Sequence, residues 1–170
     1  MTTARPLDSE ELASTASERE VLEAFIDAYQ DVIIARLRGL SADDARRRLV
    51  PSLTTLIGLI KHAAAVERNW FQQCLAQQLR EQVAGNSFGD DASWQAGSDE
   101  TVANVIAEYV TACDRSRQSA AGFALDDTVP HSRLGRVWLR YIYVHIIREL
   151  ARHCRHADIL REQVDGVTGH

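Results

Sequence analysis

The chain has 170 residues, which is enough for one domain with a substantial hydrophobic core. Hydrophobic residues make up 45% of the chain and charged residues 25%, as is usual for a soluble globular protein. The net charge of −5 is no signature of nucleic-acid binding, and no apolar run approaches the roughly 18 residues of a membrane span. The N-terminal residues also lack the apolar core of a signal peptide. We therefore expect a cytoplasmic protein that binds neither nucleic acid nor membranes.

The three cysteines, Cys74, Cys113 and Cys154, are widely spaced and form no CxxC pair. This spacing favours neither a disulfide framework nor a cysteine-based zinc site. Each cysteine is expected to be a small buried side chain. Cys154 adjoins His153, but neighbouring residues on a helix point about 100° apart, so the two are not expected to act together.

Residues 1–16 are polar and weakly patterned, which predicts an N-terminal arm ahead of a domain at 17–170. The string SERE that begins at Ser17 matches a capping box, so the first long helix is expected to begin there and to end near Gly39. A short helical turn then carries the basic run 46–48. Two aspartates precede this run, which favours a solvated helix face over a binding patch.

A second helix is expected from Pro51 to about residue 84, because apolar residues recur there at helical spacing. A long loop follows at 85–97 and contains two aromatic residues, Phe88 and Trp94. Loops of this length in a compact domain are often functional or lid-like. The simpler interpretation, which we favour, is that the two aromatic side chains only pin the loop to the helices.

Residues 98–122 are expected to form a third helix, 123–135 a second loop, and 136–164 a fourth helix. The sequence shows neither a strand pattern nor a hairpin signal. Four long amphipathic helices predict an all-α four-helix bundle.

The fourth helix carries a row of ionisable side chains on one face. His145, Glu149 and His153 step by four residues, and His156 continues the row, so these side chains stack along the helix. The same face carries three apolar residues: Trp138, Ile142 and Leu160. It is therefore expected to point at the core, where a row of imidazoles and a carboxylate is costly unless the groups are paired or bind something.

Glu149 and His153 are four residues apart, which lets two side chains converge on one metal ion. His145 and His153 are separated by about 12 Å along the helix axis, too far to share an ion comfortably. Helix 4 therefore offers Glu149 with one of these two histidines. His156 lies about 10 Å along the axis from Glu149 and suits a supporting role.

A third ligand must come from another helix. His62 is the only histidine of the second helix and lies close to its apolar face. His131 lies in a predicted loop and His170 ends the chain, so both are weaker candidates. Two nitrogens and one carboxylate leave open positions on a metal, which is typical of a catalytic site. The set suits zinc, and nickel, iron and manganese are alternatives.

An interpretation without metal stands beside this one. A lone histidine on an apolar helix face is usually a hydrogen-bonded core residue, and Glu149 has Arg148 and Arg152 as possible ion-pair partners. Spacing alone does not choose between the two interpretations.

Two segments carry a resemblance to a known family. They are LVPSLTTLIGLIKHAAAVERNWF at 49–71 and LRYIYVHIIRELARHCRHADILREQVDGVTG at 139–169. Both resemble the DinB-like (YfiT-like) four-helix metalloenzyme superfamily, in particular its actinobacterial branch of mycothiol-dependent S-transferases. Weaker similarity between them extends the resemblance over most of the chain.

The resemblance implies a left-handed up-down-down-up bundle, often a homodimer, with a divalent metal held by His62, Glu149 and His153. The chain departs from the family string at Arg148, where an acidic residue is usual, and at Arg155, where glycine is usual. Both changes add positive charge, which either favours an acidic substrate or thiol or has no functional meaning.

The function that the resemblance implies is transfer of a low-molecular-weight thiol to a small electrophilic substrate. In this interpretation His156 has a catalytic role, as a proton relay or in orienting a ligand, and His145 is expected to be a core histidine bonded to a neighbouring helix. The alternatives are a metal-dependent hydrolase that uses activated water, a metal-dependent isomerase, and a metal- or ligand-binding bundle without turnover.

Overall fold

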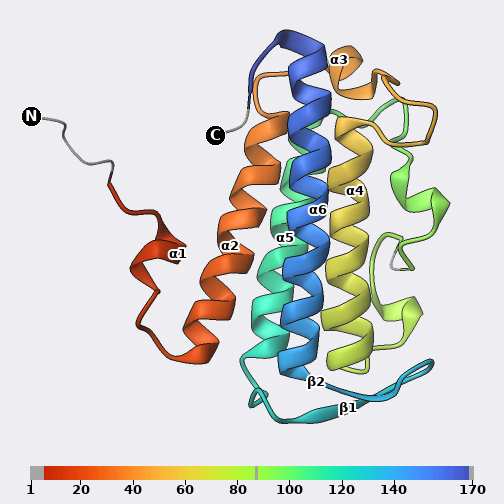
Figure 1. Ribbon diagram of the computed structural model, residues 1–170. Coiled ribbons are helices and arrows are strands. Elements are labelled where there is room, and N and C mark those ends of the chain that lie inside the picture. The colour runs from red at the N-terminus through yellow and green to blue at the C-terminus, as the bar shows by residue number, and fades with distance from the viewer. Residues whose placement is uncertain (1–5, 87, 169–170) are drawn as a thin grey trace, which may run out of the picture.

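The computed structural model describes residues 6–86 and 88–168, and most of these residues are helical. Four long helical segments lie side by side, and α6 sits between α2 and α4 in the view of Figure 1. Their bounds are α2 at Glu18–Leu37, α4 at Leu56–Glu67 continuing into η1 at Arg68–Leu75, α5 at Val102–Ala120, and α6 at Leu139–Asp165. The helical character is as predicted, whereas the handedness and topology implied by the resemblance stay predictions.

Short helices fill parts of the remaining chain. Helix α1 lies in the predicted N-terminal arm, away from the bundle in Figure 1, and α3 forms the predicted turn with the basic run. The bounds are α1 at Ser9–Leu12, α3 at Ala42–Arg46, η2 at Arg80–Gln82 and η3 at Asp91–Trp94. In the described part of the chain, no helix is long and apolar enough to cross a membrane.

The capping box at Ser17 is confirmed. The Ser17 hydroxyl accepts a hydrogen bond from the backbone N–H of Glu20, and the Glu20 carboxylate accepts one from the backbone N–H of Ser17 at 2.9 Å. These bonds satisfy N–H groups that an uncapped helix start leaves free. The helix ends at Leu37, and Gly39 follows with φ of 79°, a conformation that glycine adopts without strain.

The hydrophobic core lies between the four long segments. All of them contribute buried apolar side chains, among them Ile33, Leu37, Leu59, Ile60, Tyr109, Ile142 and Ile146. At about 25 cal/mol per Å² of apolar surface removed from water, this shared core supplies most of the stabilisation of the helices.

The second predicted helix differs from the structure at both ends. It begins at Leu56 because the Thr55 hydroxyl accepts a hydrogen bond from Gly58 N–H at 3.1 Å and caps the first turn. From Arg68 the helix widens into π geometry, and it ends where Gln77 takes a φ of 52°. Glutamine is a good helix former, so the sequence hides this break.

The prediction that the chain has no strands is wrong. Strands β1 at Thr128–His131 and β2 at Gly135–Trp138 form an antiparallel hairpin in which Val129 faces Val137. Four-residue strands are too short to show clear alternation, and Gly135, with φ of 76°, supplies the turn.

Trp138 belongs to this hairpin rather than to the fourth helix, and α6 begins at Leu139. The first N–H groups of α6 donate to backbone carbonyls, from Leu139 to Asp127 at 3.1 Å and from Arg140 to Leu125 at 3.0 Å. No side-chain cap marks this start. Trp138 is 54% exposed, so its predicted place on the core face is wrong.

The connection between η1 and α5 runs along the outer side of α4, where η3 packs against that helix (Figure 1). Arg46, which was predicted to lie on a solvated helix face, holds the C-terminal end of this connection. Its guanidinium donates to the carbonyls of Gly97 at 2.7 Å and Glu100 at 2.5 Å. This anchoring places a loop segment directly against the helix that carries His62.

A cavity of about 480 Å³ lies on another side of α4, and a buried carboxyl lines it. The side chain of Glu67 is 1% exposed, and its Oε1 accepts a hydrogen bond from Gln30 Nε2 at 2.7 Å. Among the described residues, its Oε2 has no hydrogen-bond partner. Burial raises the pKa of Glu67, against the lowering effects of nearby Ser116 and Gln30.

We expect the Glu67→Gln variant to be more stable than the native chain at high pH and no more stable near pH 4. The raised pKa means that the native state keeps a proton which the unfolded chain releases, so stability is lost as pH rises through the native pKa. Thermal unfolding between pH 4 and 9 measures the difference, and about 1 kcal/mol corresponds to a melting-temperature change of about 2–4 °C at this chain length. The exposed Glu162→Gln variant is the control, and a pH-independent gain for Glu67→Gln would contradict the prediction.

Candidate metal centre

The three predicted ligands come together on one side of the bundle. His62 projects from α4, and Glu149 and His153 project from α6, which packs against α4. The ring centroids of His62 and His153 are 5.1 Å apart, with the two planes at 70°. Both histidines are buried, at 9% and 4% exposure, so neither is a surface residue.

The imidazole of His62 is held in one orientation by the loop that follows η1. Its Nδ1 lies 2.8 Å from the Ser93 hydroxyl, and that hydroxyl donates its proton to the Asp90 carbonyl at 2.5 Å. Because the hydroxyl proton is already engaged, Nδ1 must be the donor and Nε2 carries a lone pair. Trp94 stacks on the ring at 4.0 Å and 14°. This is the tautomer in which Nε2 can bind a metal ion.

His153 has the electrostatics of a neutral ligand. Burial lowers its pKa to about 4, helped by the neighbouring His62. Its Nδ1 is buried and has no hydrogen-bond partner, and its Nε2 lies 4.0 Å from Glu149 Oε2. At neutral pH this contact therefore joins a neutral imidazole and a carboxylate, and it is not an ion pair.

Glu149 also makes the contacts of the interpretation without metal. Its Oε1 accepts from Arg152 at 2.6 Å and from Arg148 at 3.1 Å. Both arginine side chains are more than half exposed, so each pair contributes at most about 1 kcal/mol. These contacts engage one carboxylate oxygen and leave Oε2 on the side of His153.

The donor set fits a divalent metal in kind, but its atoms are spaced more widely than a tetrahedral site needs. Two donors that each lie about 2.1 Å from a tetrahedral zinc ion are about 3.4 Å apart. His153 Nε2 and Glu149 Oε2 are 4.0 Å apart. Within residues 6–86 and 88–168, no three His, Cys, Asp or Glu side chains stand close enough to hold an ion. Closing the set around a metal requires the side chains to rotate.

A comparison with known families covers nearly all of this architecture. A family model described as Mycothiol-S-transferase matches residues 21–166, from the first turn of α2 to the end of α6. The chain belongs to the mycothiol-S-transferase family. Comparison with curated proteins gives no match. The matched range confirms the resemblance drawn from segments 49–71 and 139–169.

In this member of the mycothiol-S-transferase family, the two residues that depart from the family motif, Arg148 and Arg155, lie in different surroundings. Arg148 contacts Glu149 and lies beside the candidate metal centre. Arg155 is exposed and pairs with Asp158, whose carboxylate also binds Arg36 of α2 at 2.5 Å. Only Arg148 therefore adds charge at the site.

The other histidines of α6 are less buried than the expected ligands. His145 is half-buried, packs on Trp70 of η1 at 4.3 Å, and contacts Arg148 of its own helix. It is therefore not the fully buried histidine, bonded to another helix, that the sequence suggested. His156 is exposed, with its ring 6.4 Å from that of His153. The remaining candidate, His170, lies outside the described residues.

The cysteines behave as the sequence predicted for small buried side chains. Cys113 and Cys154 are buried, and burial raises the pKa of Cys154 to about 12. Cys74 is partly buried, and burial raises its pKa as well. A thiol with a raised pKa stays protonated and is a poor nucleophile, so burial disfavours these cysteines as nucleophiles.

Sequence reasoning missed two residues of the site, Ser93 and Trp94. The favoured interpretation, that the loop aromatics only pin the loop, holds in part, because Trp94 packs against the His62 ring. The pinned surface is itself part of the site. The unusual length of the predicted loop was the one available signal.

Proposed function

We propose that this member of the mycothiol-S-transferase family transfers mycothiol, or a similar low-molecular-weight thiol, to an electrophilic small molecule. In this proposal His62, Glu149 and His153 hold a divalent metal ion, with zinc the best match to two nitrogens and one carboxylate. The observation that supports it most directly is the tautomer of His62, which leaves Nε2 bare beside a neutral His153.

His62, Glu149 and His153 would hold the divalent ion, which when bound would supply Lewis acidity that favours the deprotonated form of a thiol near neutral pH. The protein's own groups do the rest. Ser93 and Trp94 fix the orientation of His62, and burial keeps both histidines neutral and able to act as ligands. In the reaction the sulfur forms a bond to an electrophilic carbon, the thiol proton passes to a base or to water, and the leaving group departs with its electron pair.

We assign His156 to proton transfer or ligand orientation at the edge of the site. Its exposed ring lies 6.4 Å from His153, outside the ligand set. The His156→Ala variant is therefore expected to keep its metal within a few-fold and to lose roughly 10–100-fold in transfer rate, as residues that support metal ligands do. Metal content measured beside the transfer rate checks this, and an emptied site would instead make His156 a ligand.

The experiment that tests the function is a transfer assay with purified, metal-loaded protein, mycothiol and 1-chloro-2,4-dinitrobenzene. The expected result is a thioether product formed faster than in the absence of protein, with no turnover when mycothiol is omitted. Bacillithiol in place of mycothiol tests the choice of thiol. Turnover of ester or amide substrates without any thiol would instead support a hydrolase, and metal binding without turnover would support a binding bundle.

The resemblance also implies a homodimer, and the sequence composition led us to expect a cytoplasmic location; both stay predictions. Light scattering of the purified protein gives the oligomeric state directly. A monomeric mass at concentrations well above those used in the transfer assay would contradict the dimer.

A further inference from the structure

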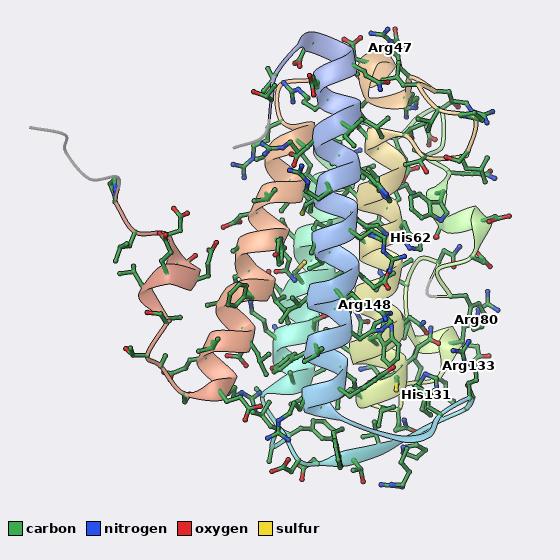
Figure 2. The ribbon with its side chains drawn as sticks, viewed as in Figure 1. Arg47, His62, Arg80, His131, Arg133 and Arg148 are labelled. Atoms are coloured by element: carbon green, nitrogen blue, oxygen red, sulfur yellow. The ribbon has the colours of Figure 1, made fainter. Side chains whose placement is uncertain are left out.

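A second feature lies next to the candidate metal centre and has no role in holding the metal. It is a cleft of about 870 Å³ between η1, the β1–β2 hairpin and the first turns of α6. We call it the aromatic cleft and define it by six of its lining residues: Trp70, Gln73, His131, Arg133, His145 and Arg148. Figure 2 shows His131, Arg133 and Arg148 on the same side of the bundle as His62.

The cleft and the candidate metal centre share one side chain, Arg148. One nitrogen of its guanidinium, Nη2, lies 3.2 Å from His145 Nδ1 inside the cleft and 3.1 Å from Glu149 Oε1 in the proposed ligand set. The described lining of the cleft includes none of the three proposed ligands, so Arg148 marks the end of the cleft that approaches the metal centre.

The fixed charges of the lining are positive. Two arginines line the cleft, and its described lining contains no aspartate or glutamate, although the chain as a whole has a net charge of −5. Arg133 forms no ion pair with any described residue. The side-chain nitrogen Nε2 of Gln73 is buried and has no hydrogen-bond partner among the described residues. A buried donor without a partner is costly, and a ligand acceptor would remove that cost.

His131 adds a further donor. Its Nδ1 accepts from the backbone N–H groups of Arg133 at 3.1 Å and Leu134 at 3.2 Å, so in the neutral ring the proton is on Nε2. The cleft thus offers fixed positive charge and N–H groups, beside amide and hydroxyl groups such as those of Asn69, Gln77 and Ser132. This lining is complementary to an anion and unfavourable to a cation.

The rest of the lining is flat and aromatic. Trp70 packs between the rings of His131 at 5.2 Å and His145 at 4.3 Å, and Tyr141, which is 43% exposed, lies 6.1 Å from Trp70. The exposure of Tyr141 gives the cleft an accessible ring. Aromatic surfaces of this kind bind planar apolar groups.

We propose that the aromatic cleft binds the electrophilic substrate, and that this substrate is a planar, aromatic carboxylate. The ring lies on the aromatic wall, Arg133 pairs with the carboxylate, and Arg148 lies at the end nearest the metal centre. This inference rests on the transferase function proposed above, because only that function makes the bound molecule a substrate. Binding of the anion itself does not depend on turnover.

Binding is tested with 3-nitrobenzoate and its neutral counterpart 3-nitrobenzamide, titrated calorimetrically into the purified full-length protein without thiol. The acid is expected to bind roughly tenfold or more tightly than the amide, the difference a charged hydrogen bond makes. Arg133→Gln is expected to abolish most of that difference, whereas Arg155→Gln, whose side chain pairs with Asp158 outside the cleft, should preserve it. Equal affinities for acid and amide would overturn the proposal, as would equally tight binding of cyclohexanecarboxylate.

Arg148 also contacts Glu149, so Arg133→Gln is the decisive variant and Arg148→Gln supports it. The kinetic test uses mycothiol with 4-chloro-3-nitrobenzoate or 4-chloro-3-nitrobenzamide. In that reaction the sulfur bonds to the ring carbon, the carbon–chlorine bond breaks, chloride leaves, and the thiol proton passes to water. The acid should have the lower KM, and Arg133→Gln should raise it without changing the KM of mycothiol.

The two proposals fail separately. If the acid binds preferentially and Arg133→Gln removes the preference, but neither compound is turned over, the cleft is confirmed and the transferase function is wrong. If both compounds react and Arg133→Gln raises the KM of mycothiol instead, the cleft belongs to the thiol and the inference is overturned.

Discussion

Replacing His62, Glu149 or His153 with alanine is expected to remove most of the bound divalent metal. Each change deletes one of three donors that come from two different helices, and the remaining two leave most coordination positions to water. Because loss of a group that merely supports a ligand already weakens metal binding by roughly 10–100-fold, loss of a ligand should weaken it by more. Elemental analysis after dialysis against a weak chelator measures the stoichiometry.

The control for these variants is His145→Ala. His145 lies on the same helix, packs against Trp70, and is not one of the proposed ligands, so its loss should leave metal content nearly unchanged. Circular dichroism confirms that each variant stays helical. An emptied site in His145→Ala with full occupancy in His153→Ala would mean that His145 and Glu149 form the true pair, one turn earlier on α6. Full metal content in His62→Ala would refute the proposed centre.

The pH dependence of metal release follows from the same geometry. Burial lowers the pKa of His153 to about 4 and that of His62 in the same direction. Both rings therefore gain a proton at a lower pH than an exposed histidine does, and His153 gains one only near pH 4. Metal should be retained as pH falls through the range in which exposed histidines are protonated, and it should be lost by the pH at which His153 is protonated. Release near pH 6.5 would indicate solvent-exposed ligands.

The long helices could be predicted from the sequence because the signals that indicate a helix are local. The capping box at Ser17 and the apolar repeats that follow it depend on residues within a few turns of each other. The hairpin at 128–138 and the end of η1 at Gln77 were missed, because the hairpin strands are short and glutamine gives no sign of a positive φ. In both places tertiary contacts decide the backbone conformation over local preference.

The candidate site, too, could be predicted where it depends on local spacing and not where it depends on packing. The spacing of Glu149 and His153 lies within one helix and is readable from the sequence, whereas the 5.1 Å between His62 and His153 depends on how α4 packs against α6. Before the structure, His62 was joined to that pair by elimination among the histidines and by the family resemblance. Ser93 and Trp94 belong to a loop with no periodic pattern, so its length was a signal for a functional loop but did not indicate their contact with His62.

That contact rests on the close approach of two backbones at Gly58. A Cβ atom at this position would lie 2.5 Å from the backbone oxygen of Trp94 and 2.9 Å from Thr55 Oγ1. The first atom belongs to the backbone of η3 and the second caps α4 through its bond to Gly58 N–H. Neither is the free end of a flexible side chain, so a methyl group must push η3 away from α4 or disturb the helix start.

We therefore expect the Gly58→Ala variant to lose both stability and metal affinity. Alanine in place of glycine inside a helix normally stabilises by roughly 0.5–1 kcal/mol, but forcing a methyl group into a filled space costs roughly 1–3 kcal/mol. The net loss should lower the melting temperature by several degrees, at about 2–4 °C per kcal/mol. Displacing Ser93 and Trp94 frees the His62 ring, which should weaken metal binding by roughly 10–100-fold. Calorimetric unfolding and a metal titration measure the two effects.

Gly122→Ala is the matched control, because a Cβ atom there meets no other atom within 4 Å. Its melting temperature and metal affinity should stay close to those of the native chain. A Gly58→Ala protein that melts higher and binds metal as tightly would show that the helix and η3 separate without disturbing His62. In that case His62 would owe its orientation to α4 and α6 alone, and Ser93→Ala would leave metal binding unchanged. If instead Ser93→Ala weakens metal binding as Gly58→Ala does, the loop is what holds His62 in its metal-binding tautomer.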